Sequence, residues 1–426
     1  MHASPLLITE FIQQCNQHAA TRWVVGLSGG LDSIVLLELA FRTLPASKLH
    51  VVHVNHHLQE KADEWAAFCE NQAAIRGLPF TLFDVSPHSS SEASAREARY
   101  AAFESFLEEG DILLLAHHAN DQAETLLFRL MRGAGLKGLS GMPKTRLLAG
   151  GALLRPLLGC TKKMLEEWAQ AERLLWIDDP SNTNTDYDRN FLRISILPLL
   201  EKRWSFAVSH LAQASQYLAQ DYSVLSEYLE EDLAALRVTK TKLDWKQLSG
   251  LSTSKQLALV RYWFSQVTGV SLTEKHVREL NQLLSAHLAS LQLGRWELKR
   301  YKQYLYIVDS LLPLVQYDAP LKEGIYEYPA GVLVVKRVNK GARLISLDRV
   351  RLSSRQEGMS CRANGRQNKS LKKLFQEADI PAWQRIYWPV LTVENEVVAI
   401  PNICVAEGWQ CVDDLNPGYE VIWEPF

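Results

Sequence analysis

The chain has 426 residues, more than one compact domain usually holds, so two or three domains are expected. Hydrophobic residues make up 47% of the sequence, which suffices for a sizeable core and excludes a wholly disordered chain. The formal net charge of −2, from 46 Lys and Arg against 48 Asp and Glu, argues against a uniformly basic nucleic-acid-binding surface. It leaves room for a local basic face.

The sequence shows no cysteine pattern typical of a metal site or disulfide framework, and no signal peptide or membrane span. The six cysteines form no Cys-x-x-Cys pair, which argues against zinc knuckles, iron–sulfur clusters and a dense disulfide framework. The N-terminus lacks a basic segment and meets Glu10 early, unlike a signal peptide. The longest apolar runs, such as Ile112 to Ala116, have the length of a strand rather than of a membrane span. We therefore expect a soluble cytoplasmic protein with no membrane partner.

Short apolar runs alternate with longer amphipathic segments between residues 23 and 200. The apolar runs predict buried strands at 23–27, 49–55, 79–84 and 112–116. The amphipathic segments predict helices at 33–43, 60–76, 92–108, 121–132 (capped by Asn120) and 162–171. This alternation is typical of a parallel β-sheet with helices on both faces.

The rest of the chain predicts two further parts. Residues 194–236 have a helical pattern with a break at Pro198, and we interpret them as a bridge out of the first domain. Leu-rich helices and a strand pair at 296–307 follow, and then a small mixed region with one clear helix at 370–378. The predicted fold class is α/β. Its domains are a nucleotide-binding domain with the bridging helix (1–215), a mainly helical middle domain (216–325) and a linker with a small mixed α/β domain (326–426).

Charge is unevenly distributed along the chain. Residues 331–385 contain 13 Lys or Arg and 4 Asp or Glu, whereas residues 386–426 contain no Lys or Arg and 7 Asp or Glu. A near-neutral total therefore conceals a basic segment followed by an acidic one.

A glycine-rich loop lies directly between the first predicted strand and the first predicted helix. It reads Ser28-Gly29-Gly30-Leu31-Asp32-Ser33. The glycines allow close approach to phosphate oxygens and positive φ, the helix N-terminus directs free N–H groups to the same place, and two hydroxyls add donors. Asp32 would repel a phosphate but is explained if it holds a bridging Mg²⁺. The loop therefore predicts a phosphate site, although it lacks the Walker A pattern. The alternative is an ordinary βα turn.

Two histidine-rich loops follow the second and fourth predicted strands, at His53–His57 and at His117–Thr125. Because the carboxyl ends of parallel strands share one crevice, we expect these loops and the phosphate loop to form one site. Asp121 and Glu124 share a helix face and are candidates to hold Mg²⁺, deprotonate an amine or orient an ammonium. The alternatives are a solvated first-turn pair and, for the histidines, a metal site, although their spacing matches no zinc site.

Two more polar clusters precede the bridging helix. Arg96 and Arg99 lie one helical turn apart and suit bidentate phosphate contacts, with ordinary surface charges as the alternative. The polar run from Asp178 to Asn182 continues with Tyr187, Arg189, Asn190 and Arg193. Such density in a loop is typical of functional segments.

The phosphate loop resembles the S-G-G-x-D-S signature of the PP-loop ATP pyrophosphatase superfamily. Within it, the ordered motifs resemble the tRNA(Ile)-lysidine synthase family: the phosphate loop, His53-Val54-Asn55-His56, Arg96-x-x-Arg99-Tyr100, His118 to Thr125, Arg132-Gly133-x-Gly135-x-x-Gly138-Leu139-x-Gly141-Met142 and Asp179-Pro180-Ser181-Asn182 through Arg189-Asn190. The run from Lys369 to Pro381 resembles that family's terminal domain. One departure is visible, because Asn120-Asp121 replaces the family's usual Asp-Asp pair, so we assign the role to Asp121.

The resemblance implies a concrete reaction. ATP would adenylate the C2 oxygen of the wobble cytidine in an isoleucine tRNA with a CAU anticodon, and the ε-amine of free lysine would displace AMP to form lysidine. A pyrimidine C2 carbonyl is a poor electrophile, which adenylation corrects, and the lysine ammonium must lose a proton to a carboxylate or histidine.

The same resemblance implies site residues. The expected catalytic residues are Asp32, Asp121, Glu124 and His117, with Mg²⁺ on Asp32. The expected ATP-binding residues are Ser28, Gly29, Gly30, Leu31, Asp32, Ser33, His53 and Asn55. The expected substrate or tRNA contacts are Arg96, Arg99, Asp179, Arg189, Asn190, Arg193, Lys369, Lys372 and Lys373.

The basic segment is then expected to meet RNA phosphates, with Arg362, Arg366 and Arg385 flanking the three lysines. Trp383 is expected to pack rather than to stack on a base. A solvated basic face is the alternative. Rival functions are a PP-loop tRNA thiolase, which needs cysteines near the site, an ammonia-using synthetase, and an RNA-binding adaptor with a vestigial nucleotide fold. The choice between a monomer and a homodimer stays open.

Overall fold

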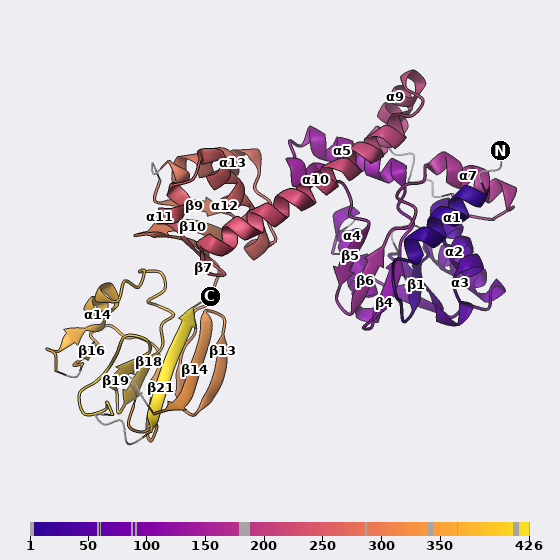
Figure 1. The fold of residues 1–426 in the computed structure, drawn as a ribbon. Helices are drawn as coiled ribbons and strands as arrows, with labels where there is room; N and C mark the ends of the chain where they lie inside the picture. Colours follow the sequence, from indigo (N-terminus) through magenta and orange to yellow (C-terminus); the bar gives the residue numbers. More distant parts are fainter. Residues whose placement is uncertain are drawn as a thin grey trace. The chain divides into compact units, whose positions relative to one another are not determined.

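The computed structural model describes residues 4–57, 59, 61–86, 88–89, 92–178, 188–285, 288–339, 344–363, 365–411 and 417–425. The chain divides into two compact units, Met1–Ser226 and Glu227–Phe426. The long helix α10 (Ala207–Leu236) begins in the first unit and ends in the second (Figure 1).

The N-terminal unit is built on a six-stranded sheet in the order β3–β2–β1–β4–β6–β5. All neighbouring strands pair in parallel except the edge strand β5, which is antiparallel to β6. The strands are β1 (Trp23–Gly26), β2 (Leu49–Asn55), β3 (Phe80–Asp84), β4 (Asp111–Leu114), β5 (Thr145–Leu148) and β6 (Gly151–Leu154). The helices are α1 (Ser4–Cys15), α2 (Leu31–Thr43), η1 (Ala46–Lys48), α3 (Ala62–Ile75), α4 (Glu92–Phe106), α5 (Ala119–Met131), α6 (Leu136–Leu139), α7 (Lys162–Ala171), α8 (Asp188–Phe191), the π-helical turn η3 (Leu192–Ile196) and α9 (Leu197–Arg203).

Helices cover both faces of this sheet because neighbouring strand residues point to opposite sides. Val25 and Leu114 belong to a buried cluster with residues of α1, α2, α3 and α7. Val24 and Leu113 belong to a second cluster with residues of α4. Figure 1 shows α4 on one side of the sheet and α1, α2 and α3 on the other. The predicted parallel sheet with helices on both faces is confirmed.

The predicted strands and helices of this unit are present, but several elements were missed and two details differ. The helix α1, the short helices η1, α6 and α8, and the β5–β6 hairpin were not predicted. The N-cap of α5 is His118 rather than Asn120, which lies inside the helix. The predicted break at Pro198 is not found, because helical residues continue without interruption from Asp188 through the π-helical turn η3 to Arg203, with this proline in the first turn of α9. The helical run is interrupted instead between Arg203 and Ala207.

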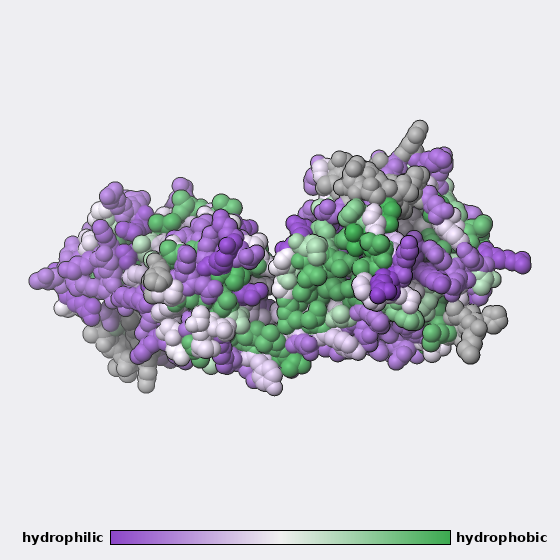
Figure 2. Space-filling model, turned by 90° about the horizontal axis from the view of Figure 1, so that it is seen from above, coloured by the Kyte–Doolittle hydropathy of each residue, from purple (hydrophilic) through white to green (hydrophobic). Residues whose placement is uncertain are grey.

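Large apolar side chains stay exposed near this interruption. Trp204 and Phe206 are 60% and 66% exposed, and α9 projects from the rest of its unit in Figure 1. Figure 2, the view from above, shows a broad hydrophobic area on one side of the N-terminal unit. No described helix is both long enough and apolar enough to cross a membrane.

The C-terminal unit holds two separate hydrophobic clusters. The first lies between helices and a five-stranded antiparallel sheet, β7–β8–β11–β10–β9, which extends the predicted strand pair. Its elements are β7 (Arg237–Thr239), β8 (Lys242–Asp244), α11 (Trp245–Ser249), α12 (Thr253–Thr268), α13 (Glu274–Leu284), β9 (Ser290–Leu293), β10 (Trp296–Tyr301) and β11 (Tyr304–Asp309).

The second cluster fills the end of the chain, where sheets surround one helix. The sheets have the orders β12–β15–β18–β19–β20, β13–β14–β21 and β16–β17. The elements are β12 (Asp318–Pro320), β13 (Gly324–Tyr328), β14 (Gly331–Val338), β15 (Arg351–Ser353), β16 (Ser360–Cys361), β17 (Lys369–Ser370), α14 (Leu371–Glu377), β18 (Val390–Val393), β19 (Glu396–Ile400), β20 (Cys404–Val405) and β21 (Gly418–Pro425). The predicted helix at 370–378 corresponds to α14.

Candidate active site

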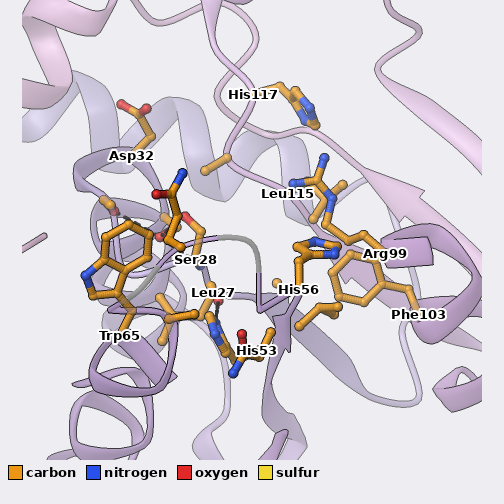
Figure 3. Close-up of a pocket in the computed structure, with 18 of the residues that line it drawn as sticks. Leu27, Ser28, Asp32, His53, His56, Trp65, Arg99, Phe103, Leu115 and His117 are labelled. Atoms are coloured by element: carbon orange, nitrogen blue, oxygen red, sulfur yellow. Dashed lines mark hydrogen bonds between the residues drawn. The ribbon is translucent and has the colours of Figure 1, made fainter. Parts of the chain in front are cut away.

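A cavity of about 460 Å³ opens at the carboxyl ends of β1, β2 and β4. Chain order reverses between β1 and β4, and such switch points are where open α/β sheets bind ligands. Nine of the predicted site residues line the cavity: Ser28, Gly30, Asp32, Ser33, His53, Asn55, Arg99, His117 and Asp121. Figure 3 shows Asp32 and Trp65 on one side, with Arg99, His56 and Phe103 on the other. Trp65 was not predicted.

The glycine-rich loop is held by its own serine. Ser33 Oγ donates to the Gly30 carbonyl at 2.9 Å and accepts the Ser28 N–H at 3.1 Å, so this hydroxyl stabilises the loop. Gly29 has φ +85° and its carbonyl accepts the Ile177 N–H, whereas Gly30 is the extended N-cap of α2. Only one glycine of the pair therefore needs the left-handed region. Leu31 packs against the buried cluster beneath α2, and neither Gly29 nor Leu31 lines the cavity.

Asp32 faces the cavity from the first turn of α2. Its Oδ2 lies 3.4 Å from His118 Nε2, while Oδ1 is buried and has no hydrogen-bond partner among the described residues. Among these residues there is no cluster of three or more His, Cys, Asp or Glu side chains suited to a metal. One carboxylate oxygen without a partner beside a phosphate loop fits Mg²⁺, which binds through one or two carboxylates plus substrate phosphates. It does not fit a zinc cage.

The polar side chains at the end of β2 and in the loop after it mainly form hydrogen bonds that stabilise the loop conformation. His53 Nδ1 donates to the Leu27 carbonyl at 2.7 Å, which ties the end of β2 to β1. Asn55 Nδ2 donates to Asp63 at 2.9 Å, and its Oδ1 accepts the His57 N–H at 3.0 Å. Burial lowers the pKa of the neighbouring His56 to about 4, so this ring is neutral near pH 7. These residues line the cavity beside the phosphate loop as polar groups without a formal charge.

The N-terminus of α5 combines a histidine with two carboxylates. Asp121 Oδ2 accepts the His118 N–H at 2.9 Å and lies 3.6 Å from His118 Nε2. Burial disfavours charge on His118, but the carboxylates of Asp121 and Asp32 outweigh it and raise its pKa. Burial likewise acts against ionised Asp121, yet His118, through its charge and its backbone N–H, and Arg193 lower its pKa overall. His118 therefore connects the carboxylate of the phosphate loop to that of α5.

Glu124 lies one turn further along and does not line the cavity. Arg193, from η3, donates to its two oxygens at 2.7 and 2.9 Å and lies 3.5 Å from Asp121 Oδ1. Burial raises the pKa of Glu124 although Arg193 opposes the shift. The predicted shared face of Asp121 and Glu124 is thus present. Arg193, expected to contact substrate, holds both carboxylates in place.

The comparisons with known proteins cover almost the whole chain. A PP-loop domain model matches residues 5–200, the TilS substrate binding domain matches 243–306 and the TilS substrate C-terminal domain matches 350–423. The tRNA(Ile)-lysidine synthase of Pseudomonas aeruginosa is 37% identical over 426 residues, covering 95% of this chain and 93% of that protein. The enzyme of the same name from Pseudomonas syringae pv. tomato is 36% identical and covers 91% of this chain and 90% of its own. This chain belongs to the tRNA(Ile)-lysidine synthase family.

Asn120, where the resemblance leads us to expect an aspartate, has a structural role. Asn120 Oδ1 accepts the Lys162 N–H at 2.9 Å, which attaches the first turn of α5 to the first turn of α7. Since a carboxylate oxygen accepts the same bond, an asparagine here keeps the contact between the helices. Of the two neighbours, only Asp121 lines the cavity.

The family's glycine-rich run after α5 is held against that helix. Gln122 donates to the Met142 carbonyl at 2.9 Å and accepts its N–H at 2.7 Å. Arg129 donates to the carbonyls of Gly138 and Gly141, each at 2.8 Å. A Cβ on Gly141 would lie 2.2 Å from Ser215 Oγ, so the close approach of this loop to α10 requires glycine.

Arg155, which was not predicted, follows β6 at the same sheet edge and donates to His117 Nδ1 at 3.3 Å. The available signal was a charged residue directly after the apolar run Ala152–Leu154. Arg96 lies over the Tyr100 ring, 5.1 Å from its centroid, rather than in the cavity. Arg189 and Asn190 lie on α8, outside the cavity lining. Asp179 lies outside the described residues.

Some basic residues of the C-terminal unit are exposed, whereas others are paired with a carboxylate or buried. Lys372 and Lys373 are exposed on α14, whereas Lys369 pairs with Glu377 at 2.8 Å. Arg385 is only 8% exposed and donates to the Ile380 carbonyl, so the expectation that it flanks an RNA surface is wrong. Trp383 packs edge-to-face on Tyr301 and Tyr306, which confirms packing.

Proposed function

We propose that this chain joins free L-lysine to C2 of the wobble cytidine in an isoleucine tRNA with a CAU anticodon, and converts ATP to AMP and pyrophosphate. The observation that carries the proposal is the single cavity in which the PP-loop Asp32 and the α5 carboxylate Asp121 meet through His118. It combines a phosphate-binding end with an ammonium-binding end, as this two-step ligation requires.

The adenylation step is assigned to the phosphate loop. Free N–H groups at the start of α2 and the loop backbone bind the triphosphate, and Asp32 holds Mg²⁺. Bound there, Mg²⁺ neutralises charge that builds on the leaving pyrophosphate. The C2 oxygen attacks the α-phosphorus and becomes the oxygen of an AMP leaving group.

The lysine step is assigned to α5. Asp121 is ionised at neutral pH because its pKa is lowered, so it attracts the lysine ammonium and orients the ε-nitrogen toward C2. Glu124 and Arg193 hold Asp121 in position. The ammonium gives up a proton to the Asp121 carboxylate, and the neutral ε-amine then attacks C2, forms the new carbon–nitrogen bond and expels AMP.

The remaining roles concern RNA and organisation. We assign tRNA backbone contacts to Lys372 and Lys373, whose side chains are exposed on α14. We also propose that 1–215, 216–325 and 326–426 act as catalytic, middle and tRNA-binding domains, in the cytoplasm where tRNA and ATP are present.

The deciding experiment measures AMP release with purified full-length chain, ATP, Mg²⁺ and an isoleucine tRNA transcript bearing CAU, with and without lysine. Mass spectrometry of the digested tRNA then detects lysidine. A methionine tRNA, which shares the CAU anticodon, is the matched control and is expected to stay unmodified. AMP release at the same rate with and without lysine, or AMP release that depends on ammonia or a sulfur donor, would contradict the proposal.

A further inference from the structure

A buried arginine contacts His117 at the edge of the active-site cavity. Arg155 is 2% exposed, and its three nitrogens donate to His117 Nδ1 at 3.3 Å, the Pro143 carbonyl at 2.6 Å and Tyr100 Oη at 3.2 Å. Among the described residues no carboxylate pairs with this guanidinium. A buried cation without a counter-ion is costly, so its retention at a cavity edge calls for a reason beyond stability.

The contact determines which nitrogen of His117 carries the proton. A guanidinium has only N–H donors, so Nδ1 of His117 must present its lone pair to Arg155. A neutral imidazole with an unprotonated Nδ1 carries its hydrogen on Nε2. Nε2 then has no lone pair with which to take a proton from an amine. In this arrangement His117 is a hydrogen-bond donor and not a base.

The surrounding charges keep the ring neutral. Burial lowers the pKa of His117 to about 3, the carboxylate of Asp121 on α5 opposes this, and Arg155, with Arg99 and Arg96 on α4, adds to it. A neutral donor is useful here, because an imidazolium in the cavity would repel the incoming lysine ammonium. It still strengthens a hydrogen bond to an oxygen that gains negative charge during the reaction.

We propose that Arg155 is a positioning residue that fixes His117 as a neutral Nε2–H donor to a phosphate oxygen of the adenylated intermediate. The identity of the oxygen that accepts this hydrogen bond rests on the proposed function. The tautomer of His117 does not depend on it. The lysine-facing role then belongs to Asp121, and His117 is assigned to the leaving AMP.

The tautomer is measured without substrate by NMR of ¹⁵N-histidine-labelled full-length chain. The His117 signals are identified by their absence in His117→Gln. In the unsubstituted chain we expect an Nε2-protonated pattern that does not titrate between about pH 5 and 8. In Arg155→Met we expect both tautomers and a pKa higher than in the unsubstituted chain, although burial still holds it below the ordinary histidine value of about 6.5. An Nδ1-protonated ring in the unsubstituted chain would overturn the proposal even if Arg155→Met does not fold.

Activity provides a second test. We expect Arg155→Met to lower kcat for AMP release by about 10²-fold, as loss of one oriented donor does, with little change in KM for ATP. His117→Gln keeps an N–H donor and should retain more activity than His117→Ala, whereas a base could not be replaced by an amide. Arg146→Met is the matched control, since Arg146 also contacts Tyr100, with its guanidinium 5.3 Å from the ring centroid, but has no contact with His117 among the described residues.

The outcomes separate the two proposals. If the unsubstituted chain shows no lysine-dependent AMP release, the proposed function fails while the tautomer remains measurable. If that activity is present but Arg155→Met leaves the His117 signals and kcat unchanged, the role of Arg155 fails alone. Equal effects of Arg146→Met and Arg155→Met would also overturn it, because they would show a general charge effect.

Discussion

The buried ion pair between Arg193 and Glu124 predicts a stability change with a distinctive pH dependence. The Glu124 side chain is 4% exposed and that of Arg193 is 37% exposed. Removing one partner of a fully buried pair costs about 3–5 kcal/mol. Because Arg193 is more than a third exposed, solvent screening reduces this, and we expect Arg193→Met to lose about 1–3 kcal/mol at pH 7. At about 2–4 °C per kcal/mol, the melting temperature should fall by roughly 2–12 °C.

The sign of the pH effect follows from Glu124. Burial already raises its folded-state pKa above that of the unfolded chain, and loss of Arg193 raises it further. At a pH between the pKa of Glu124 in the unfolded chain, about 4.3, and its higher pKa in the folded chain, the folded state binds more protons than the unfolded state. The contribution of Glu124 to stability is therefore fully present below the unfolded pKa, and it is lost as the pH rises through the folded pKa. The penalty of Arg193→Met should therefore be small near pH 4.5 and larger at pH 8.

Calorimetry of the full chain between pH 4.5 and 8 measures the loss of unfolding free energy caused by Arg193→Met. The loss is taken from the unfolding transition whose midpoint the substitution shifts. Glu124→Gln in the Arg193→Met background removes the unpaired charge but keeps the shape, and we expect it to recover most of the loss at pH 8. A penalty independent of pH, or one that Glu124→Gln leaves unchanged, would refute the assignment of the cost to a buried carboxylate.

Three further predictions concern the loop and the RNA surface. Asp32→Ala should reduce tRNA-dependent AMP release by at least about 10²-fold while filter binding of tRNA stays nearly unchanged, and parallel loss of tRNA binding would indicate a misfolded loop. Gly29→Ala should cost about 1–2 kcal/mol in urea unfolding and raise KM for ATP, since φ is +85° and the added Cβ would lie 3.1 Å from Ile177 Cδ1. Gly133→Ala, with φ +69° and no atom within 4 Å, is its control, and an equal rise in KM there would count against the loop. Neutralising Lys372 and Lys373 to Gln should weaken tRNA binding and reduce the slope of log K against log salt by about 1.5, with KM for ATP unchanged. An unchanged slope would show that these lysines are not part of the RNA-binding surface.

Elements with strong local patterns were predictable, and elements defined by their surroundings were not. The strands at 49–55 and the helix at 162–171 follow from periodicity and agree with the structure within a residue or two. The hairpin of β5 and β6 was missed because β5 is an exposed edge strand with no continuous apolar run. The cap of α5 was misplaced because Asn120 has the higher capping propensity, but its side chain is used by α7.

The sequence by itself determined the phosphate loop, the convergence of polar loops at one sheet edge and the family, because these depend on residue order and on the alternation of strands and helices. Only the tertiary structure decided which polar atoms are available. Arg193 meets Glu124 across 69 residues of sequence, and Arg155 meets His117 across 38. Such pairings arise when packing brings distant segments together, and burial then makes each hydrogen bond and charge decisive. For that reason the sequence placed Arg193 on the substrate and treated His117 as a candidate base. The structure shows Arg193 paired with Glu124 and Arg155 donating to His117 Nδ1, and from the second contact we infer a donor role for this histidine.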